Sequence, residues 1–173
     1  TLTTPVAMTA TALTGCTATV VLTAPTAADN CSGVTLSNNA PATFPIGNTV
    51  VTWTATDAAG NTVTKTQLVT VTDTTVPTIS TPVAMTATAG NNCSAVVVLT
   101  APTAADNCTT VTLTNNAPAS GLFPIGVTTV TWTATDASGN TGTATQTITV
   151  IDVTAPTLTT PVAMTATAVT GCA

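Results

Sequence analysis

Threonine alternates with small apolar residues along much of the chain. Within Thr49–Thr56, the side chains of Val51, Trp53 and Ala55 fall on one face of an extended backbone, and threonines fall on the other. A period of two places one face against a core and the other in water. The β-branched residues Thr and Val also favour extended backbone. The pattern therefore predicts an all-β protein.

Turn signals separate these stretches. Asp57–Asn61 predicts a hairpin turn with Gly60 at positive φ, and Asp136–Asn140 predicts the same turn further along. Phe44–Gly47 predicts a kinked edge segment, because Pro45 has no N–H to donate to a ladder. In the first half of the chain, strands are predicted at Val6–Ala12, Ala18–Ala24, Val34–Asn38, Thr49–Thr56 and Thr62–Thr72. Short strands between turns are typical of a β-sandwich.

The chain repeats itself. The sequence TPVAM begins at Thr4, Thr81 and Thr160, and VLTAPTAADNC and TWTATDA each occur twice. Such periodicity predicts tandem modules. We predict that residues 1–3 are a linker from a preceding module, 4–80 and 81–159 are complete modules, and 160–173 is the first strand of a third, truncated one. The joint Asp73–Thr78 contains Pro77 and no glycine, so we expect the modules to form a stiff rod within a longer array.

The composition excludes several functions. Charged residues make up 4% of the chain, against about a quarter in ordinary domains. A single Lys and no Arg cannot neutralise phosphates, so we expect no nucleic-acid partner. Without His, Glu, Arg or Tyr, acid–base catalysis and His/Cys metal sites lack their residues, so we predict no enzyme, no cofactor and no metal site. Thr and Pro interrupt every apolar stretch before the roughly 18 residues that a membrane span needs.

Cysteine spacing suggests disulfides. The five cysteines are Cys16, Cys31, Cys93, Cys108 and Cys172. Each complete repeat holds a pair at the same spacing, which predicts Cys16–Cys31 and Cys93–Cys108 bonds, each worth about 3 kcal/mol for a loop of about 15 residues. Pairing between modules or chains stays open at this point. Cys172 occupies the position of Cys16, so its predicted partner lies further along the array. Disulfides favour a secreted or cell-surface location.

Several motifs together resemble the hyalin repeat (HYR) domain. They are DNC at 29–31, FPIG at 44–47, TWTATDAAGN at 52–61 and the Asp73…Pro77 joint, and the second repeat has the same series. The resemblance covers nearly the whole chain. It implies tandem immunoglobulin-like β-sandwich modules in extracellular proteins linked to adhesion, many of them bacterial surface or secreted proteins. It supplies no catalytic residues.

One departure from the family affects the cysteines. Members often carry a Cys in the last strand, where Lys65 and Ala144 stand here. The resemblance therefore implies that the disulfide in each module uses the early cysteine, Cys16 or Cys93, in place of the last-strand cysteine, as in members with an early Cys.

The remaining candidate residues have two interpretations each. The aromatic side chains predicted to form the cores are Trp53, Trp132, Phe44 and Phe123. An exposed Trp could instead stack on a sugar ring, but converging polar groups for such a site are lacking. The six Asp residues fit local turn caps, and the alternative is a calcium site that joins Asp73 or Asp152 to a loop Asp of the next module.

These observations lead to a structural function. A net charge of −5 gives little repulsion between chains, and the predicted edge strands lack protective Lys residues. We predict a component of an extracellular fibre or surface filament that self-associates, with threonine hydroxyls as candidate acceptors for glycans. The alternatives are the stalk of a cell-surface adhesin whose ligand-binding domain lies elsewhere, and a spacer module of a secreted hydrolase.

Overall fold

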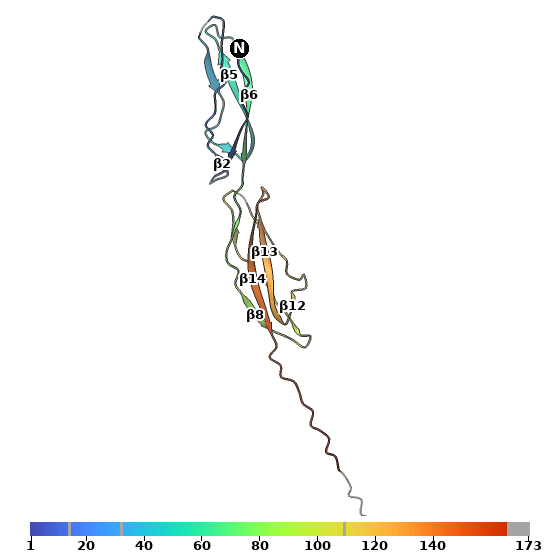
Figure 1. The fold of residues 1–173 in the computed structure, drawn as a ribbon. Helices are drawn as coiled ribbons and strands as arrows, with labels where there is room; N and C mark the ends of the chain where they lie inside the picture. Colours follow the sequence, from blue (N-terminus) through green and yellow to red (C-terminus); the bar gives the residue numbers. More distant parts are fainter. Residues whose placement is uncertain (14, 32, 109, 166–173) are drawn as a thin grey trace, which may run out of the picture.

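The computed structural model describes residues 1–13, 15–31, 33–108 and 110–165, which form two β-sandwich-like modules placed end to end (Figure 1). Module 1 consists of β1 (Met8–Thr11), β2 (Thr17–Ala18), β3 (Thr35–Asn38), β4 (Phe44–Pro45), β5 (Gly47–Thr56) and β6 (Thr62–Thr72). Module 2 consists of β7 (Thr78–Ile79), β8 (Met85–Thr88), β9 (Ser94–Val96), β10 (Ala104–Ala105), β11 (Thr112–Asn115), β12 (Leu122–Pro124), β13 (Gly126–Thr135) and β14 (Thr141–Ile151). Within the described ranges, no helix is long and apolar enough to cross a membrane.

Each module has one large sheet and smaller strand pairs. In module 1 the large sheet has the order β1-β6-β5-β3, with β1 parallel to β6 and the other pairs antiparallel. Module 2 repeats it as β11-β13-β14-β8. The two-stranded sheets β2–β4 and β9–β12 complete the sandwiches, and β7–β10 is matched in module 1 by the bridge between Leu2 and Ala27. The predicted all-β class with tandem modules is confirmed.

The threonine alternation builds the cores. In β5 the side chains of Val51, Trp53 and Ala55 are buried, and the threonines between them are half-buried. All four aromatic side chains predicted for the cores are buried: Trp53 and Trp132 are 5% exposed, Phe44 is 1% and Phe123 is 0%. Because the indoles are buried, neither offers a ring face for stacking on a sugar.

The predicted strand at Ala18–Ala24 is much shorter in the structure. Only Thr17 and Ala18 pair, with Pro45 and Phe44 as their partners. The physical reason lies in the partner strand: β4 has two residues, one of them a proline that cannot donate to a ladder. Val20 and Leu22 nevertheless pack against the core of module 1, so the segment contributes side chains without backbone pairing.

The predicted turn at Asp57–Asn61 is confirmed. The Oδ1 atom of Asp57 accepts hydrogen bonds from the backbone N–H groups of Ala59 at 2.9 Å and Asn61 at 2.8 Å. Gly60 has a φ of 89°, a left-handed conformation that glycine adopts at little cost. The side-chain hydrogen bond from Asn61, with its backbone N–H, holds the pKa of Asp57 below its ordinary value.

The segment between the modules belongs structurally to module 2. The predicted boundary at Thr81 places Thr78–Ile79 in the first module, but this strand, β7, pairs with β10 of module 2. At the other end, described residues 152–165 carry no strand and are exposed. Residues 166–173, which hold the rest of the predicted third-module strand and Cys172, lie outside the described residues.

Candidate functional site

The joint between the two modules brings together polar side chains from the linker and from two loops of module 2. The loop Asp106–Cys108 of module 2 faces the end of module 1, and its shape is local: the Cys108 N–H donates to Oδ2 of Asp106 at 2.9 Å. The equivalent loop of module 1 has the same bond, from Cys31 to Asp29, at 3.1 Å. The sequence DNC therefore folds into the same turn in both modules, but only the second copy lies at the joint.

Direct hydrogen bonds cross the joint. The Nδ2 atom of Asn107 donates to the carbonyl oxygen of Leu13 at 3.2 Å, and the Cys108 Sγ lies 3.8 Å from the same oxygen. The Cys108 side chain also packs against the hydrophobic core of module 1, although it belongs to module 2. The Cys16 thiol contacts the backbone carbonyl of Cys108. Module 2 thus caps the end of the module 1 core.

The linker is held to both modules. Asp73 follows β6 directly and is only 7% exposed, and its Oδ1 accepts the Thr75 N–H at 3.0 Å. Its backbone carbonyl accepts a 3.2 Å bond from Nδ2 of Asn140, in the β13–β14 turn of module 2. Pro77 is buried against module 2. A linker with a buried carboxylate, a buried proline and a bond to the next module has few free torsions, so it favours a fixed joint.

The cysteines do not lie as the sequence spacing suggests. The Cys16 carbonyl accepts from Ile46 at 3.3 Å, immediately before β5 begins, whereas Cys31 lies near the other end of β5, beyond Asp29. A ten-residue strand spans about 30 Å, and a disulfide needs Cα atoms within about 7 Å. Cys16–Cys31 therefore does not fit this fold, and Cys93–Cys108 fails for the same reason.

The four described cysteines are unpaired in this structure, and they fall into two groups. Cys31 and Cys93 are exposed at the outer ends of the modules, whereas Cys16 and Cys108 are half-buried side by side at the joint. Burial raises the pKa of the Cys108 thiol to about 11, helped by the hydrogen bond with Cys16 and the negative charge of Asp73.

Cys16 and its equivalent in module 2, Cys93, share an unusual backbone conformation. Cys16 and Cys93 are the non-glycine residues with positive φ in the described ranges, at 61° and 55°. This left-handed conformation costs a residue with a Cβ about 1–2 kcal/mol. Cys16 stands at the end of module 1 that faces module 2, and Cys93 stands at the equivalent end of module 2.

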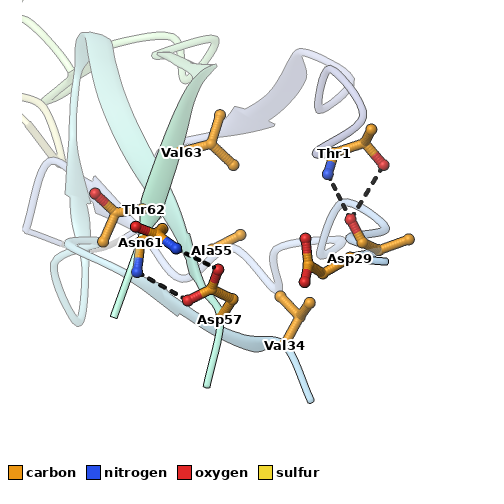
Figure 2. Close-up of a pocket in the computed structure, with 9 residues that line it drawn as sticks. Thr1, Asp29, Val34, Ala55, Asp57, Asn61, Thr62 and Val63 are labelled. Atoms are coloured by element: carbon orange, nitrogen blue, oxygen red, sulfur yellow. Dashed lines mark hydrogen bonds between the residues drawn. The ribbon is translucent and has the colours of Figure 1, made fainter. Parts of the chain in front are cut away.

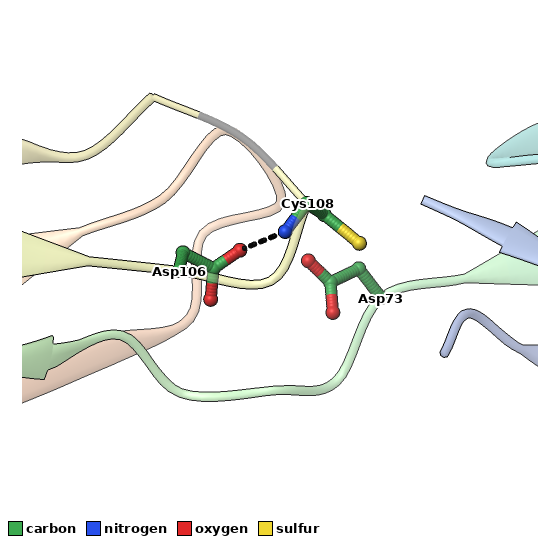
Figure 3. Close-up of side chains that lie close together, drawn as sticks. All are labelled: Asp73, Asp106 and Cys108. Atoms are coloured by element: carbon green, nitrogen blue, oxygen red, sulfur yellow. Dashed lines mark hydrogen bonds between the residues drawn. The ribbon is translucent and has the colours of Figure 1, made fainter. Parts of the chain in front are cut away.

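Two carboxylates and a thiol lie close together beside these contacts. Figure 3 shows Asp73 and Asp106 facing one another next to Cys108, and one ligand atom from each lies within 4.8 Å of the others. Three oxygens of the linker and the Asp106–Cys108 loop are buried with no hydrogen-bond partner: Asp73 Oδ2, Asp106 Oδ1 and Asn107 Oδ1. A calcium site that joins Asp73 to a loop Asp of the next module is the alternative to turn caps that the sequence allows. Asp73 and Asp106 are the residues of that alternative.

The far end of module 1 has an open pocket where module 2 has its linker. The pocket is lined by residues that include Asp29, Asp57 and Asn61, and Figure 2 shows the Asp57–Asn61 bond at its wall. The equivalents of Asp57 and Asn61 in module 2 are Asp136 and Asn140, whose end is covered by the segment that begins at Asp73.

Sequence reasoning missed two buried glutamines that support the tryptophans. Trp53 Nε1 donates to Gln67 at 2.8 Å, and Trp132 Nε1 donates to Gln146 at 2.9 Å. Gln67 and Gln146 are 1% and 0% exposed. The signal was present in the sequence, because a glutamine follows each tryptophan at the same spacing in a strand otherwise rich in threonine.

Two all-β modules with a packed joint define a tandem-repeat protein of sandwich modules. Comparison with known proteins supports this class: the HYR domain matches residues 3–71 and 72–150. The chain belongs to the HYR domain family. It is 40% identical over 152 residues to hyalin of Strongylocentrotus purpuratus, and 40% identical over 138 residues to hyalin of Lytechinus variegatus.

These matches cover 82% and 75% of this chain but only 13% and 26% of the two hyalins, so the chain spans a small part of the relatives' length. Both relatives come from sea urchins, and the comparisons lend no support to the bacterial origin that the resemblance implied. HYR modules fit a structural or adhesive role outside the cell.

Solved structures with a similar fold are cadherin ectodomains. Mouse cadherin-23 EC22-24 matches with a TM-score of 0.39 and 20% identity, covering 87% of this chain and 65% of that one. Drosophila N-cadherin EC1-4 matches with a TM-score of 0.44 and 10% identity, covering 86% and 48%.

Proposed function

We propose that this chain is a structural segment of an extracellular fibre or surface filament built from tandem HYR modules. The observation that carries the proposal is the packed joint, in which Cys108 of module 2 lies against the core of module 1. A linker that merely tethers two modules needs no such contact. A load-bearing rod does, because each joint must resist bending between two thin cores. A non-catalytic role follows from the same proposal.

We further propose that a disulfide between Cys16 and Cys108 closes this joint. The two residues are neighbours across the joint, where the Cys16 thiol contacts the backbone carbonyl of Cys108. Formation removes one proton and one electron from each thiol, and an external disulfide accepts both electrons as it is reduced to two thiols. The pairing replaces the two intramodule bonds that sequence spacing suggested, and it links consecutive modules covalently.

Trypsin gives a sharp test because the chain contains one Lys and no Arg. Cleavage after Lys65 separates residues 1–65 from 66–173. If Cys16 and Cys108 are bonded, the two fragments stay together after cleavage of the alkylated, denatured chain and part only on reduction. If the bonds were Cys16–Cys31 and Cys93–Cys108, the fragments would part without reductant, and the proposed disulfide would be wrong.

Matched variants identify the bonded residues. Cys16→Ser and Cys108→Ser should each release the two fragments without reductant. Cys31→Ser and Cys93→Ser stand at the equivalent positions of the other module and should leave the fragments linked. Linkage that survives Cys16→Ser would assign the bond to other cysteines.

Lateral self-association is the second half of the proposal. Val50 and Leu68 are register partners on the outer face of β5 and β6, and they are 58% and 40% exposed. The equivalent pair in module 2 is Thr129 and Thr147. Uncharged strand faces of this kind lose little hydration energy when chains pack side by side, and their threonine hydroxyls are also where we expect glycans.

Sedimentation velocity at increasing concentration separates the fibre from the adhesin stalk. A fibre segment should form ordered multimers, and Val50→Lys should weaken them while Thr129→Lys has less effect. A stalk or a hydrolase spacer should remain a monomeric rod at every concentration, and that outcome would remove the fibre proposal.

A further inference from the structure

The oxygens at the joint carry buried negative charge that a positively charged ligand would compensate. Asp73 is more than nine-tenths buried, and its Oδ2 has no partner although its Oδ1 is bonded to Thr75. Asp106 Oδ1 and Asn107 Oδ1 are also buried and unpartnered. A buried acceptor without a donor costs about 1–3 kcal/mol, and more if it carries charge. Two of these acceptors belong to carboxylates that each place an oxygen within 4.8 Å of the other, and the third is on the next residue of the same loop. Such a set indicates a positively charged ligand.

No side chain of the protein can supply this charge. Lys65 is the only basic residue in the sequence. It lies in the middle of β6, and a strand rises roughly 3.3 Å per residue, which places it about 25 Å from Asp73. The chain amino group at Thr1 lies at the opposite end of module 1, bonded to the carbonyl of Ala28. Two facing carboxylates therefore remain uncompensated by the protein itself.

The element type of the unpartnered acceptor atoms indicates which cation would bind. The three unpartnered atoms are all oxygens, two from carboxylates and one from an amide. The Cys108 sulfur, in contrast, already accepts from Asn107 Nδ2 at 3.1 Å and lies against Leu13. Zinc prefers nitrogen and sulfur ligands, and the sequence has no His. Calcium takes six to eight oxygens in a flexible geometry and accepts carboxylates, amide carbonyls and water together.

We propose that the joint binds one calcium ion through the carboxylates of Asp73 and Asp106 and the side-chain amide oxygen of Asn107. These residues come from the linker and from the DNC loop of module 2, whose Asn107 also bonds Leu13 of module 1. The ion therefore links the linker to the loop that caps module 1. With water completing the shell, the affinity falls in the range of about 10⁻⁴–10⁻³ M that is common for extracellular modules.

The repeat supplies matched controls. Asp152 is equivalent to Asp73, and Asp29 is equivalent to Asp106, but both are exposed, and among the described residues neither belongs to a group of three close metal-ligating side chains. The site is complete only where one module's linker meets the next module's loop. Two modules with one joint should therefore bind one ion, not two.

Isothermal titration of the whole chain with calcium chloride, after treatment with a chelating resin, tests the proposal. We expect one ion per chain and a melting temperature that rises with calcium and falls back with chelator. Asp73→Asn and Asp106→Asn should each weaken binding by more than about tenfold, since loss of even an outer-shell partner costs metal sites 10–100-fold. Asp29→Asn and Asp152→Asn should bind as the parent chain does.

Two further measurements separate loss of calcium binding from loss of the fold and from loss of the disulfide. Asparagine retains an oxygen that can accept the Cys108 and Thr75 N–H bonds, and circular dichroism of each variant reports whether the sheets persist. Cys16→Ser/Cys108→Ser should still bind calcium, so failure of the disulfide and failure of the metal site are distinguishable. No binding at about 10 mM calcium, or binding that survives Asp73→Asn and Asp106→Asn together, would overturn the proposal.

Discussion

The indole nitrogen of Trp53 donates a 2.8 Å hydrogen bond to Oε1 of Gln67, and the Gln67 amide nitrogen donates in turn to the carbonyl of Val6 at 2.7 Å. Both side chains are almost fully buried. Trp132 and Gln146 repeat the bond in module 2. The largest side chain of each thin core is therefore fixed by a polar partner, which also ties the segment before β1 to the sheet.

Replacement of Gln67 by Met should destabilise module 1. Met fills a similar volume but leaves the Trp53 N–H and the Val6 carbonyl without partners, and each buried unsatisfied group costs about 1–3 kcal/mol. Urea unfolding followed by Trp fluorescence measures the change. Gln146→Met should have the same effect in module 2, and an unchanged midpoint in both variants would mean that the bonds contribute nothing.

Gly142 should tolerate no side chain because the linker passes over it. A Cβ at this position would lie 2.2 Å from the backbone oxygen of Pro77, so Gly142→Ala must displace the linker. Overpacking of this kind costs about 1–3 kcal/mol. Thermal unfolding should show a lower melting temperature, and the calcium affinity should fall because Asp73 lies in the displaced segment. Val63→Ala, at the equivalent exposed position of module 1, is the control and should change neither.

The contribution of Asp57 to stability should disappear in acid. Hydrogen bonds from Asn61 lower the folded-state pKa of Asp57 below its ordinary value of 3.8. A lowered folded-state pKa means that the stabilisation is fully present above the unfolded value and is lost as the pH falls through the folded value. Asp57→Asn should therefore destabilise the chain at pH 7 and by progressively less below pH 4. Urea midpoints across this range check the sign, and a difference that grows with acid would contradict it.

The stability of variants at Cys93 should depend on how well the new residue tolerates the positive φ at this position. Its φ of 55° suits glycine, whereas a β-branched residue is strained there. Cys93→Val should be about 1–2 kcal/mol less stable than Cys93→Gly, measured by unfolding under reducing conditions. Because the Cys93 side chain is exposed, loss of packing does not account for a difference, and equal stabilities would argue against the left-handed conformation.

The local features of the fold were readable from the sequence. The period of two in Thr49–Thr56 places Val51 and Trp53 in the core, and the Asp57–Asn61 turn needs only its own side chains. The strand predicted at Ala18–Ala24 was wrong in extent, because its ladder depends on a partner that contains Pro45. Residues that interact within a few positions can be predicted, whereas a strand needs a neighbour that the local pattern does not reveal.

By itself, the sequence determined the all-β class, the tandem modules and the near-absence of basic residues, since each depends on residue type, repetition or neighbouring positions. Only the tertiary structure decided which cysteines are neighbours and which carboxylates meet. The same 15-residue spacing holds Cys16 and Cys31 at opposite ends of a sandwich, because the chain runs the length of the module between them. The contact of Cys16 with Cys108 and the close approach of Asp73 to Asp106 exist because two modules meet end to end. Spacing within a module carries no information about that meeting.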